Sequence, residues 1–166
     1  MNGFLLDTNV LSELRRPQCF QSVAAFTGAQ PESLLFTSEV NFAEIRFGRD
    51  LLADQSKQKQ IDDWLAHVLR PWFAGRLLPV IENTLVGWRH IVESGRTRGY
   101  TFPEPDTLIA AVAVEHELVV VTRDVTPFVQ AGVAVLDPWL SRVTHRNGTT
   151  VAGVAVDDPN LINTVT

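Results

Sequence analysis

The sequence predicts an α/β fold in which a mostly parallel β-sheet is covered by helices on both faces. Two observations carry this prediction. Short runs such as residues 3–6, 34–37 and 118–122 are almost continuously apolar, which is typical of strands that are buried on both sides. Longer segments with helical periodicity separate these runs, and strands that alternate with helices form parallel sheets. We therefore expect a single α/β domain.

The individual elements follow from these apolar runs and from residues that begin or end helices. Pro17 ends a short helix after the first strand, and Thr37 or Ser38 caps a long helix after the second. Pro103 and Pro105 begin an apolar helix that extends to about residue 117. The predicted strands are residues 3–6, 34–37, 77–80, 118–122 and 133–136. The predicted helices after Pro17 are residues 18–29, 38–53, 56–69, 83–98 and 103–117.

The predicted domain covers residues 1–140, and the composition changes after it. Residues 141–166 contain many turn-forming residues and show no sustained hydrophobic period. A terminal segment of this kind is expected to be a poorly ordered tail. The 166 residues suffice for one domain with its own hydrophobic core.

Composition excludes several classes of function. Cys19 is the only cysteine, so an intrachain disulfide and a thiolate zinc site are both excluded, and a cytoplasmic location is expected. No apolar stretch is long enough to span a bilayer, and the N-terminus does not resemble a signal peptide, so we expect no membrane association. The net charge of −5 argues against a general nucleic-acid coat but permits an acidic site that binds cations.

Two aspartates follow predicted strands. Asp7 ends the first apolar run and precedes a helix, where helix capping would explain it. Asp124 lies two residues after Thr122, where a turn-forming aspartate is the ordinary explanation. The carboxyl ends of parallel strands, however, lie at the same edge of the sheet, and ligands collect there. We therefore expect Asp7 and Asp124 to meet at that edge.

Two further carboxylates lie on predicted helices. Glu44 falls within an apolar stripe that the helical period assigns to the core, and a buried carboxylate is costly unless it is paired or bound to metal. The stripe consists of Val40, Ala43, Phe47 and Leu51. Asp106 begins an apolar helix, where the helix dipole favours an acid, and the start of this helix points to the same sheet edge.

Together the four carboxylates Asp7, Glu44, Asp106 and Asp124 predict a metal site. Like charges gathered at one edge repel one another. A hard divalent cation relieves this repulsion because it prefers oxygen ligands, and Mg²⁺ or Mn²⁺ is expected. On this interpretation Asp7 is a metal ligand rather than a helix cap.

Five segments of the chain, spread over about residues 3–140, resemble PIN-domain nucleases, and above all the VapC-type toxins and their FitB-like branch. These segments are LLDTNVLSE (5–13), SEVNFAEIRFG (38–48), PDTLIAAVA (105–113), VVVTRD (119–124) and GVAVLDPW (132–139). The resemblance implies a PIN-like domain at residues 1–140 that hydrolyses RNA phosphodiester bonds with Mg²⁺ or Mn²⁺. It also implies that the protein is the toxin of a toxin–antitoxin pair.

The resemblance further implies roles for the four acidic residues. Asp7, Asp106 and Asp124 match acidic metal-site positions of the family, directly or through water. Glu44 would hold metal-bound water or help to deprotonate it. Many relatives have Asn where this chain has Asp124, and an acid at this position keeps the metal site at full strength.

Other polar residues are candidates for supporting roles. Asn9 and Thr122 are expected to orient the carboxylates, with ordinary turn bonding as the open alternative. Arg123 and the pair Arg96 and Arg98 are candidates for contacts with RNA phosphates, with a solvated surface role as the alternative.

The partners implied by the resemblance are an RNA substrate, a VapB-like antitoxin and a second copy of the chain in a homodimer. Phe42, Ile45 and Leu52 form a second apolar stripe, which faces away from Glu44 and is the predicted partner surface unless intramolecular packing covers both stripes. An alternative function is a non-catalytic PIN-like module that binds RNA or protein. The four acidic residues argue against it, because a module that does not cut has no need of charges that repel.

Overall fold

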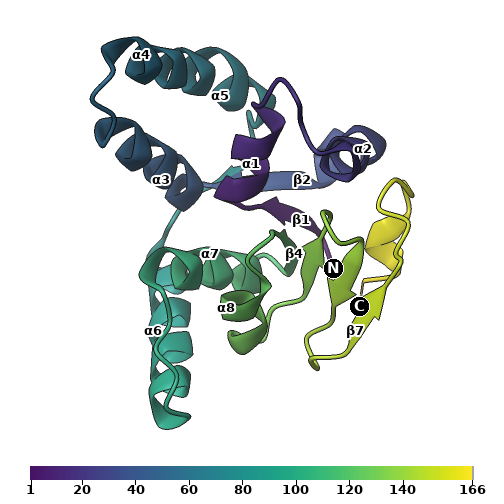
Figure 1. Cartoon of the computed structure of the whole chain (residues 1–166). Coiled ribbons are helices and arrows are strands. Elements are labelled where there is room, and N and C mark those ends of the chain that lie inside the picture. Colours follow the sequence, from purple (N-terminus) through teal and green to yellow (C-terminus); the bar gives the residue numbers. More distant parts are fainter. Residues whose placement is uncertain (166) are drawn as a thin grey trace.

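The computed structural model describes residues 1–165 and has a sheet at its centre (Figure 1). The strands are β1 (Gly3–Leu6), β2 (Leu35–Ser38), β3 (Leu77–Leu78), β4 (Leu118–Val121), β5 (Val135–Asp137), β6 (Arg142–Thr144) and β7 (Thr150–Ala152). They lie in the order β3-β2-β1-β4-β5-β6-β7. The first five strands in this order pair in parallel with their neighbours, whereas β6 pairs antiparallel with both β5 and β7. The prediction of a mostly parallel sheet is confirmed.

The register of the two central strands decides where the polar residues that follow them lie. Leu6 at the end of β1 pairs with Val121 at the end of β4. The next residues along each chain are Asp7 and Thr122, and the Asp7 amide donates to the carbonyl of Val121 at 3.1 Å. The two strands therefore deliver their polar residues to one point at the carboxyl edge of the sheet.

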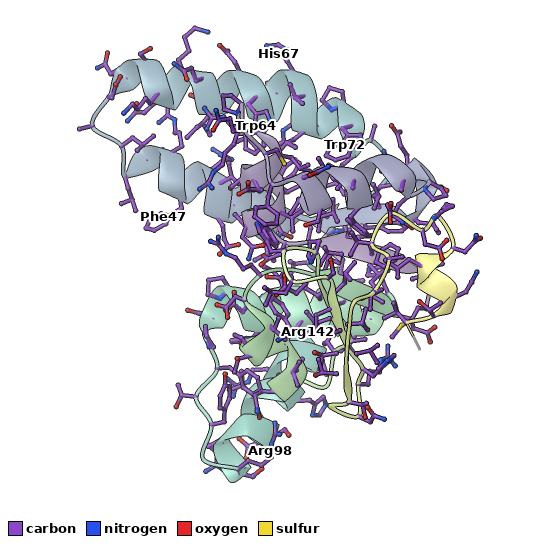
Figure 2. All side chains as sticks on the ribbon, turned by 45° about the vertical axis from the view of Figure 1, so that its right-hand side comes forward. Phe47, Trp64, His67, Trp72, Arg98 and Arg142 are labelled. Carbon is purple, nitrogen blue, oxygen red and sulfur yellow. The ribbon has the colours of Figure 1, made fainter. Side chains whose placement is uncertain are left out.

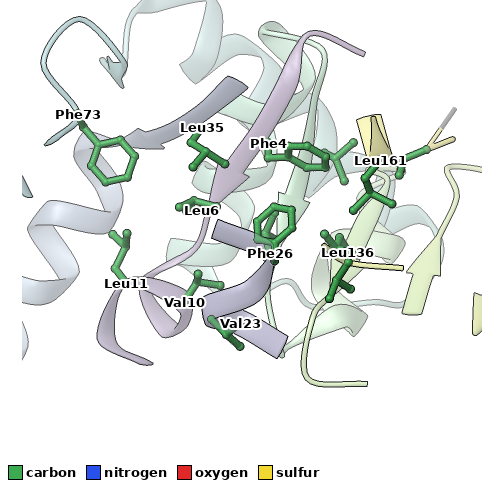
Figure 3. Packing of buried hydrophobic residues seen from close by; sticks show 14 of the residues in the cluster. Phe4, Leu6, Val10, Leu11, Val23, Phe26, Leu35, Phe73, Leu136 and Leu161 are labelled. Carbon is green, nitrogen blue, oxygen red and sulfur yellow. The ribbon is translucent and has the colours of Figure 1, made fainter. Parts of the chain in front are cut away.

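Alternate residues of the central strands enter two separate cores. Phe4 and Leu6 pack on the face shown in Figure 3, whereas Leu5 and Val120 pack on the opposite face. The first face is covered mainly by α1 (Thr8–Leu14), α2 (Gln21–Ala29), α3 (Glu39–Asp50), the π-helical turn η2 (Leu65–Leu69) and residues near α5 (Arg70–Trp72). The second is covered mainly by α6 (Glu82–Thr97), α7 (Glu104–Glu115) and α8 (Val125–Gln130). This double coverage explains why the strands read as continuous apolar runs.

The predicted helix at residues 56–69 consists of two parts. Its first part is α4 (Gln55–Trp64), and η2 continues it with wider, π-helical turns. Pro71 has no N–H to donate in an α-helical pattern, and the Arg70 N–H bonds instead to the carbonyl of Leu65, five residues earlier. Within residues 1–165, no helix is long and apolar enough to cross a membrane.

The two apolar stripes of α3 face the opposite way from the prediction. Phe42 and Ile45 are 3% and 7% exposed and belong to the core, whereas Phe47 and Leu51 are 65% and 71% exposed. Figure 2 shows Phe47 at the margin of the molecule, on the outer side of α3. The prediction was wrong because periodicity identifies two apolar faces on such a helix but does not tell which one packs inward.

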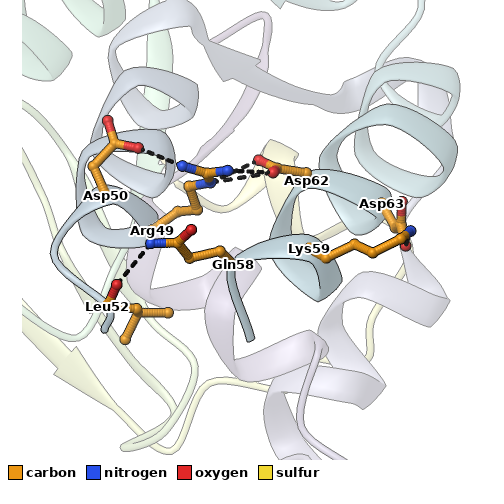
Figure 4. A network of polar contacts seen from close by, with 7 residues as sticks. All are labelled: Arg49, Asp50, Leu52, Gln58, Lys59, Asp62 and Asp63. Atoms are coloured by element: carbon orange, nitrogen blue, oxygen red, sulfur yellow. Dashed lines mark hydrogen bonds and ion pairs between the residues drawn. The ribbon is translucent and has the colours of Figure 1, made fainter. Parts of the chain in front are cut away.

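Polar contacts hold α4 beside α3 (Figure 4). The Arg49 guanidinium donates to both carboxylate oxygens of Asp62, with Nη2 at 2.8 Å from Oδ2, and also to Asp50. Gln58 donates to the carbonyl of Leu52 at 2.7 Å. These contacts are exposed or half-buried, so they fix the orientation of α4 relative to α3 and contribute little to the stability of the protein.

The segment after Leu140 is not the poorly ordered tail that the sequence predicts. Over residues 141–165 it adds β6 and β7 to the sheet and ends in the 3₁₀ turn η3 (Leu161–Asn163). Val156, Leu161 and Val165 are buried in the same core as β1, and Figure 3 shows Leu161 in this cluster. Its short apolar stretches, such as residues 151–156 and 161–162, are separated by turn-forming residues, so no sustained period reveals that they pack against a sheet.

Candidate active site

The four predicted acidic residues line one pocket of about 360 Å³ at the carboxyl edge of β1 and β4. Asp7 follows β1, and Asp124 lies just beyond β4 at the start of α8. Asp106 lies in the first turn of α7, and Glu44 projects from α3. Two sheet strands and helices from both sides of the sheet therefore contribute to one acidic pocket.

Asp7 is buried and held by four hydrogen bonds. Its Oδ1 accepts from the Thr8 amide at 2.7 Å and from Asn41 Nδ2 at 3.3 Å. Its Oδ2 accepts from Asn9 Nδ2 at 2.8 Å and from Thr122 Oγ1 at 2.7 Å. Both oxygens are thus fixed in direction. The bond from Thr8 makes Asp7 the N-cap of α1, so helix capping and a position in the pocket are combined in one residue.

The sequence predicts Asn9 and Thr122 as residues near the carboxylates, but it does not single out Asn41. This side chain is completely buried, and its Oδ1 accepts from the amide and the hydroxyl of Ser38 at 3.1 and 2.6 Å. Its Nδ2 bonds to Asp7 and to Thr8 Oγ1. The signal in the sequence is Ser38 followed three residues later by Asn41, a capping box in which Asn takes the usual place of Glu or Gln.

Glu44 is half-buried and interacts with a residue that the sequence also leaves unassigned. The hydroxyl of Thr8 donates to Glu44 Oε2. Burial raises the pKa of Glu44, the bond from Thr8 opposes this change, and the nearby Asp106 carboxylate adds to it. Thr8 therefore joins the carboxylate on α3 to the network around Asp7.

Asp106 and Asp124 have a different environment. Within residues 1–165, neither carboxylate accepts a hydrogen bond, although the Asp124 amide donates to Thr122 Oγ1 at 3.0 Å. Burial, followed by the repulsion of Asp7 and Asp124, raises the pKa of Asp106 to about 6. Burial also raises the pKa of Asp7 to about 6, against the lowering effect of its hydrogen bonds. The pocket thus concentrates carboxylates that disfavour one another's ionisation.

The donor chemistry of this pocket fits a hydrated hard cation. Its acidic side chains offer only carboxylate oxygens, which Mg²⁺ and Mn²⁺ prefer. In the part of the chain that the structure describes, no three His, Cys, Asp or Glu side chains group closely enough to enclose a metal ion. Mg²⁺ does not require such a cage, because it is commonly bound through one or two carboxylates and keeps several waters.

The arginine candidates separate into two groups. Arg123 lines the acidic pocket, and its amide donates to Asn9 Oδ1 at 3.3 Å. Arg96 pairs with Glu93 at 2.6 Å. Arg98, at the far end of α6 (Figure 2), donates to the carbonyls of Ser94 in α6 and Gln130 at the end of α8. Neither Arg96 nor Arg98 lines the pocket, whereas Arg16, which the sequence does not single out, does.

The family model of the PIN domain matches residues 4–132, which is more than half of the chain, and the protein belongs to the PIN-domain family. Among named relatives it is similar to the toxin FitB of Neisseria gonorrhoeae, with 38% identity over 135 residues that cover 81% of this chain and 97% of that protein. The VapC ribonuclease Y4jK of Sinorhizobium fredii is 33% identical over 135 residues, 81% of this chain and 96% of its own.

A solved structure supports the same assignment. The crystal structure of FitAcB from Neisseria gonorrhoeae aligns with a TM-score of 0.76 and 38% identity, over 82% of this chain and 98% of that chain. The matches cover nearly the whole of these relatives but leave about a fifth of this chain uncovered. Since the family model ends at residue 132, β6 and β7 lie beyond the matched domain.

Proposed function

We propose that this protein is a divalent-metal-dependent endoribonuclease and that it acts on RNA in the cytoplasm as the toxin of a toxin–antitoxin pair. The observation that carries the proposal is the convergence of four carboxylates in one pocket of a PIN-domain fold. The names of two relatives, a toxin and a ribonuclease, support the same activity. The raised pKa values of Asp7 and Asp106 add support, because strongly perturbed acids in a pocket are typical of functional sites.

The roles of the residues follow from their environments. Asp7, Asp106 and Asp124 would hold Mg²⁺ or Mn²⁺, and the bound metal would supply charge stabilisation and an activated water for phosphodiester hydrolysis. Asn9, Asn41 and Thr122 fix the direction of Asp7. The Thr8 hydroxyl donates to Oε2 of Glu44, so Glu44 would act through Oε1 as the base that takes a proton from water.

The decisive test is a nuclease assay on the full-length protein. Single-stranded RNA and DNA of the same sequence are incubated with Mg²⁺, Mn²⁺ or EDTA. We expect metal-dependent cleavage of RNA by the wild type and by Asp63→Asn, a control on the exposed side of α4, but none by Asp106→Asn. Binding of RNA by the wild type without metal-dependent cleavage would instead favour the non-catalytic alternative.

We also propose a homodimer formed through the outer side of α3. A shallow groove of about 420 Å³ lies between α3 and the start of α7, and Phe47 is 65% exposed beside it. Its mainly apolar lining consists of Val40, Ala43, Phe47, Gly48, Pro105 and Leu108, with Glu44 and Glu104. Apolar side chains left in water on one helix face are typical of a protein interface. Phe47→Glu should therefore lower the molar mass measured by light scattering from that of a dimer to that of a monomer.

The antitoxin partner is proposed for a second groove, of about 260 Å³, between α1, α3 and α4. Ile61 and Trp64 form its apolar wall, and Arg15 lies over the Trp64 ring at 5.4 Å from the centroid. Such a groove suits an amphipathic helix with an acidic edge. Coexpression with a cognate VapB-like antitoxin tests the proposal, because Ile61→Glu should abolish copurification while Phe47→Glu leaves it intact.

A further inference from the structure

An aromatic groove lies beside the acidic pocket. It has a volume of about 560 Å³, and its lining includes Phe20, Gln21, Trp139, Val156 and Asp157. Phe20 is 49% exposed. Val156 and Asp157 come from the segment beyond residues 4–132, so one wall of the aromatic groove lies outside the part of the chain that matches the PIN-domain model. Trp139 also lies beyond residue 132, so a large part of the groove is formed by residues outside the matched range.

Two contacts join the aromatic groove to the acidic pocket. Arg123 lines the pocket, and its guanidinium lies over the ring of Trp139, 5.5 Å from the centroid. Glu13 also lines the pocket, and its Oε1 accepts a hydrogen bond from the Phe20 amide at 2.9 Å. In each contact, one residue lines the acidic pocket and the other lines the aromatic groove. The two cavities are neighbours along one surface.

The chemistry of the aromatic groove suits an unpaired nucleotide. Aromatic side chains provide flat faces on which any base can stack, and an arginine provides a cation for the phosphate that follows it. Trp139 has a fixed backbone, because its amide donates to the buried Asp137 at 2.9 Å. Asp157 is the one acidic residue among the lining, and it disfavours a phosphate close to that wall. Arg123, which lines the acidic pocket and lies over Trp139, therefore places the cation for a phosphate on the side of the groove nearest that pocket.

We propose that the aromatic groove binds one unpaired nucleotide of the RNA next to the cleaved phosphodiester. Its base stacks on Phe20 and Trp139, and Arg123 contacts the phosphate between the groove and the acidic pocket. This inference rests on the proposed ribonuclease function and adds to it a subsite for single-stranded RNA. It assigns Phe20, Trp139 and Arg123 to substrate binding rather than to the chemical step.

The test measures RNA binding separately from cleavage. Full-length Asp106→Asn protein is titrated with a fluorescein-labelled single-stranded oligoribonucleotide in Mg²⁺, and binding is followed by fluorescence anisotropy. Phe20→Ala and Arg123→Gln, each added to this background, should weaken binding about tenfold, which is the usual effect of removing one stacking or phosphate contact. Trp139→Phe keeps an aromatic face and should change binding little, whereas Trp139→Ala should weaken it.

A modified RNA separates stacking from a merely structural effect. Single abasic nucleotides are placed at successive positions of the same oligonucleotide. At the position that occupies the groove, loss of the base should weaken binding about as much as Phe20→Ala, and the two changes together should weaken it no further. Arg123→Gln should still weaken binding of that abasic RNA, because the phosphate remains. A change that only loosened the fold would weaken binding of every oligonucleotide alike.

Matched variants complete the test. Arg46→Gln removes the same charge from an exposed position on α3, and Val86→Ala removes exposed apolar surface from α6, and both should bind RNA as the parent does. Asp157→Asn should tighten binding. Unchanged binding by Phe20→Ala and Arg123→Gln would overturn the inference and leave the groove to a protein partner, even if the wild type cleaves RNA. Absence of metal-dependent cleavage by the wild type would instead refute the ribonuclease function.

Discussion

The acidic pocket has two halves that are built in opposite ways. In the half at the end of β1, Asp7 is 5% exposed and its carboxylate accepts four hydrogen bonds. In the half formed by α7 and the start of α8, Asp106 and Asp124 accept none within residues 1–165 and are more open to solvent. The same residue type is therefore locked in one half and left without local partners in the other.

The difference teaches how a site can be both preorganised and able to accept a ligand. A locked carboxylate keeps its direction without a ligand, because hydrogen bonds from its neighbours orient both of its oxygens. A carboxylate without partners has unused acceptors that a cation can occupy, and it carries a repulsion that binding would relieve. We expect substitutions in the two halves to separate effects on catalysis from effects on stability.

The largest expected effect is that of Asp106→Asn. This change removes charge from the open half without removing a hydrogen bond, so cleavage should fall below detection while the melting temperature in EDTA rises by a few degrees. The measurements are the nuclease assay and thermal melting of the metal-free protein. A lower melting temperature than that of the wild type would mean that Asp106 stabilises the fold and that the two halves are not built differently.

Asn41→Ala changes the locked half and, unlike Asp106→Asn, should lower the stability of the protein. It leaves the buried Ser38 amide without its Asn41 acceptor and removes one of the four hydrogen bonds to Asp7, so the free energy of unfolding should fall by about 1–3 kcal/mol. Activity of the folded variant should fall about 10- to 100-fold, as for other residues that orient metal ligands. Denaturant unfolding and the nuclease assay measure the two effects. Wild-type activity in this variant would show that Asp7 needs no such support.

Mn²⁺ should distinguish the two halves by its effect on thermal stability. A ligand that binds only the folded state at 100 times its Kd stabilises it by about 2.7 kcal/mol, which corresponds to about 5–10 °C for a chain of this size. We expect this rise for the wild type, a smaller rise for Asn41→Ala and almost none for Asp106→Asn. Equal shifts in all three proteins would place the metal elsewhere.

The smallest expected effect is on the pH dependence of stability. Asp106 has a pKa of about 6 in the folded protein against an ordinary value of 3.8, so the folded state binds more protons between these values. The contribution of Asp106 to stability should therefore become less favourable as the pH rises from about 4 to about 6. In EDTA, the melting temperature of Asp106→Asn relative to the wild type should rise across this interval and level off above it. A difference that does not change with pH would contradict the raised pKa.

Much of the fold was predictable because each central strand is buried on both sides. Phe4 to Leu6 and Leu118 to Val121 are continuous apolar runs, and their parallel pairing brings the ends together as predicted. The convergence of the four carboxylates was predictable for the same reason, since it depends on strand direction rather than on packing detail. Their chemical roles stay predictions until they are tested.

What could not be predicted depends on contacts between distant residues. Both stripes of α3 are apolar, and only the packing of Phe42 and Ile45 onto the core shows which of them faces inward. Asn41 has an ordinary capping position in the sequence, and its bond to Asp7 arises from the approach of α3 to β1. In the C-terminal segment, residues such as Leu161 become buried only because the chain returns across the sheet.

The position of β1 between β2 and β4 has a consequence for the order in which the protein can fold during its synthesis. Thr122 bonds to Asp7 across a separation of 115 residues, and β4 is needed to complete the edge at which both lie. A ribosome must therefore release most of the chain before the central pair of strands can close. Contacts so distant along the chain also carry a large loop-closure cost and form late in folding. A chain that is still being synthesised and has not yet released β4, or a fragment that ends before β4, thus lacks the assembled acidic pocket.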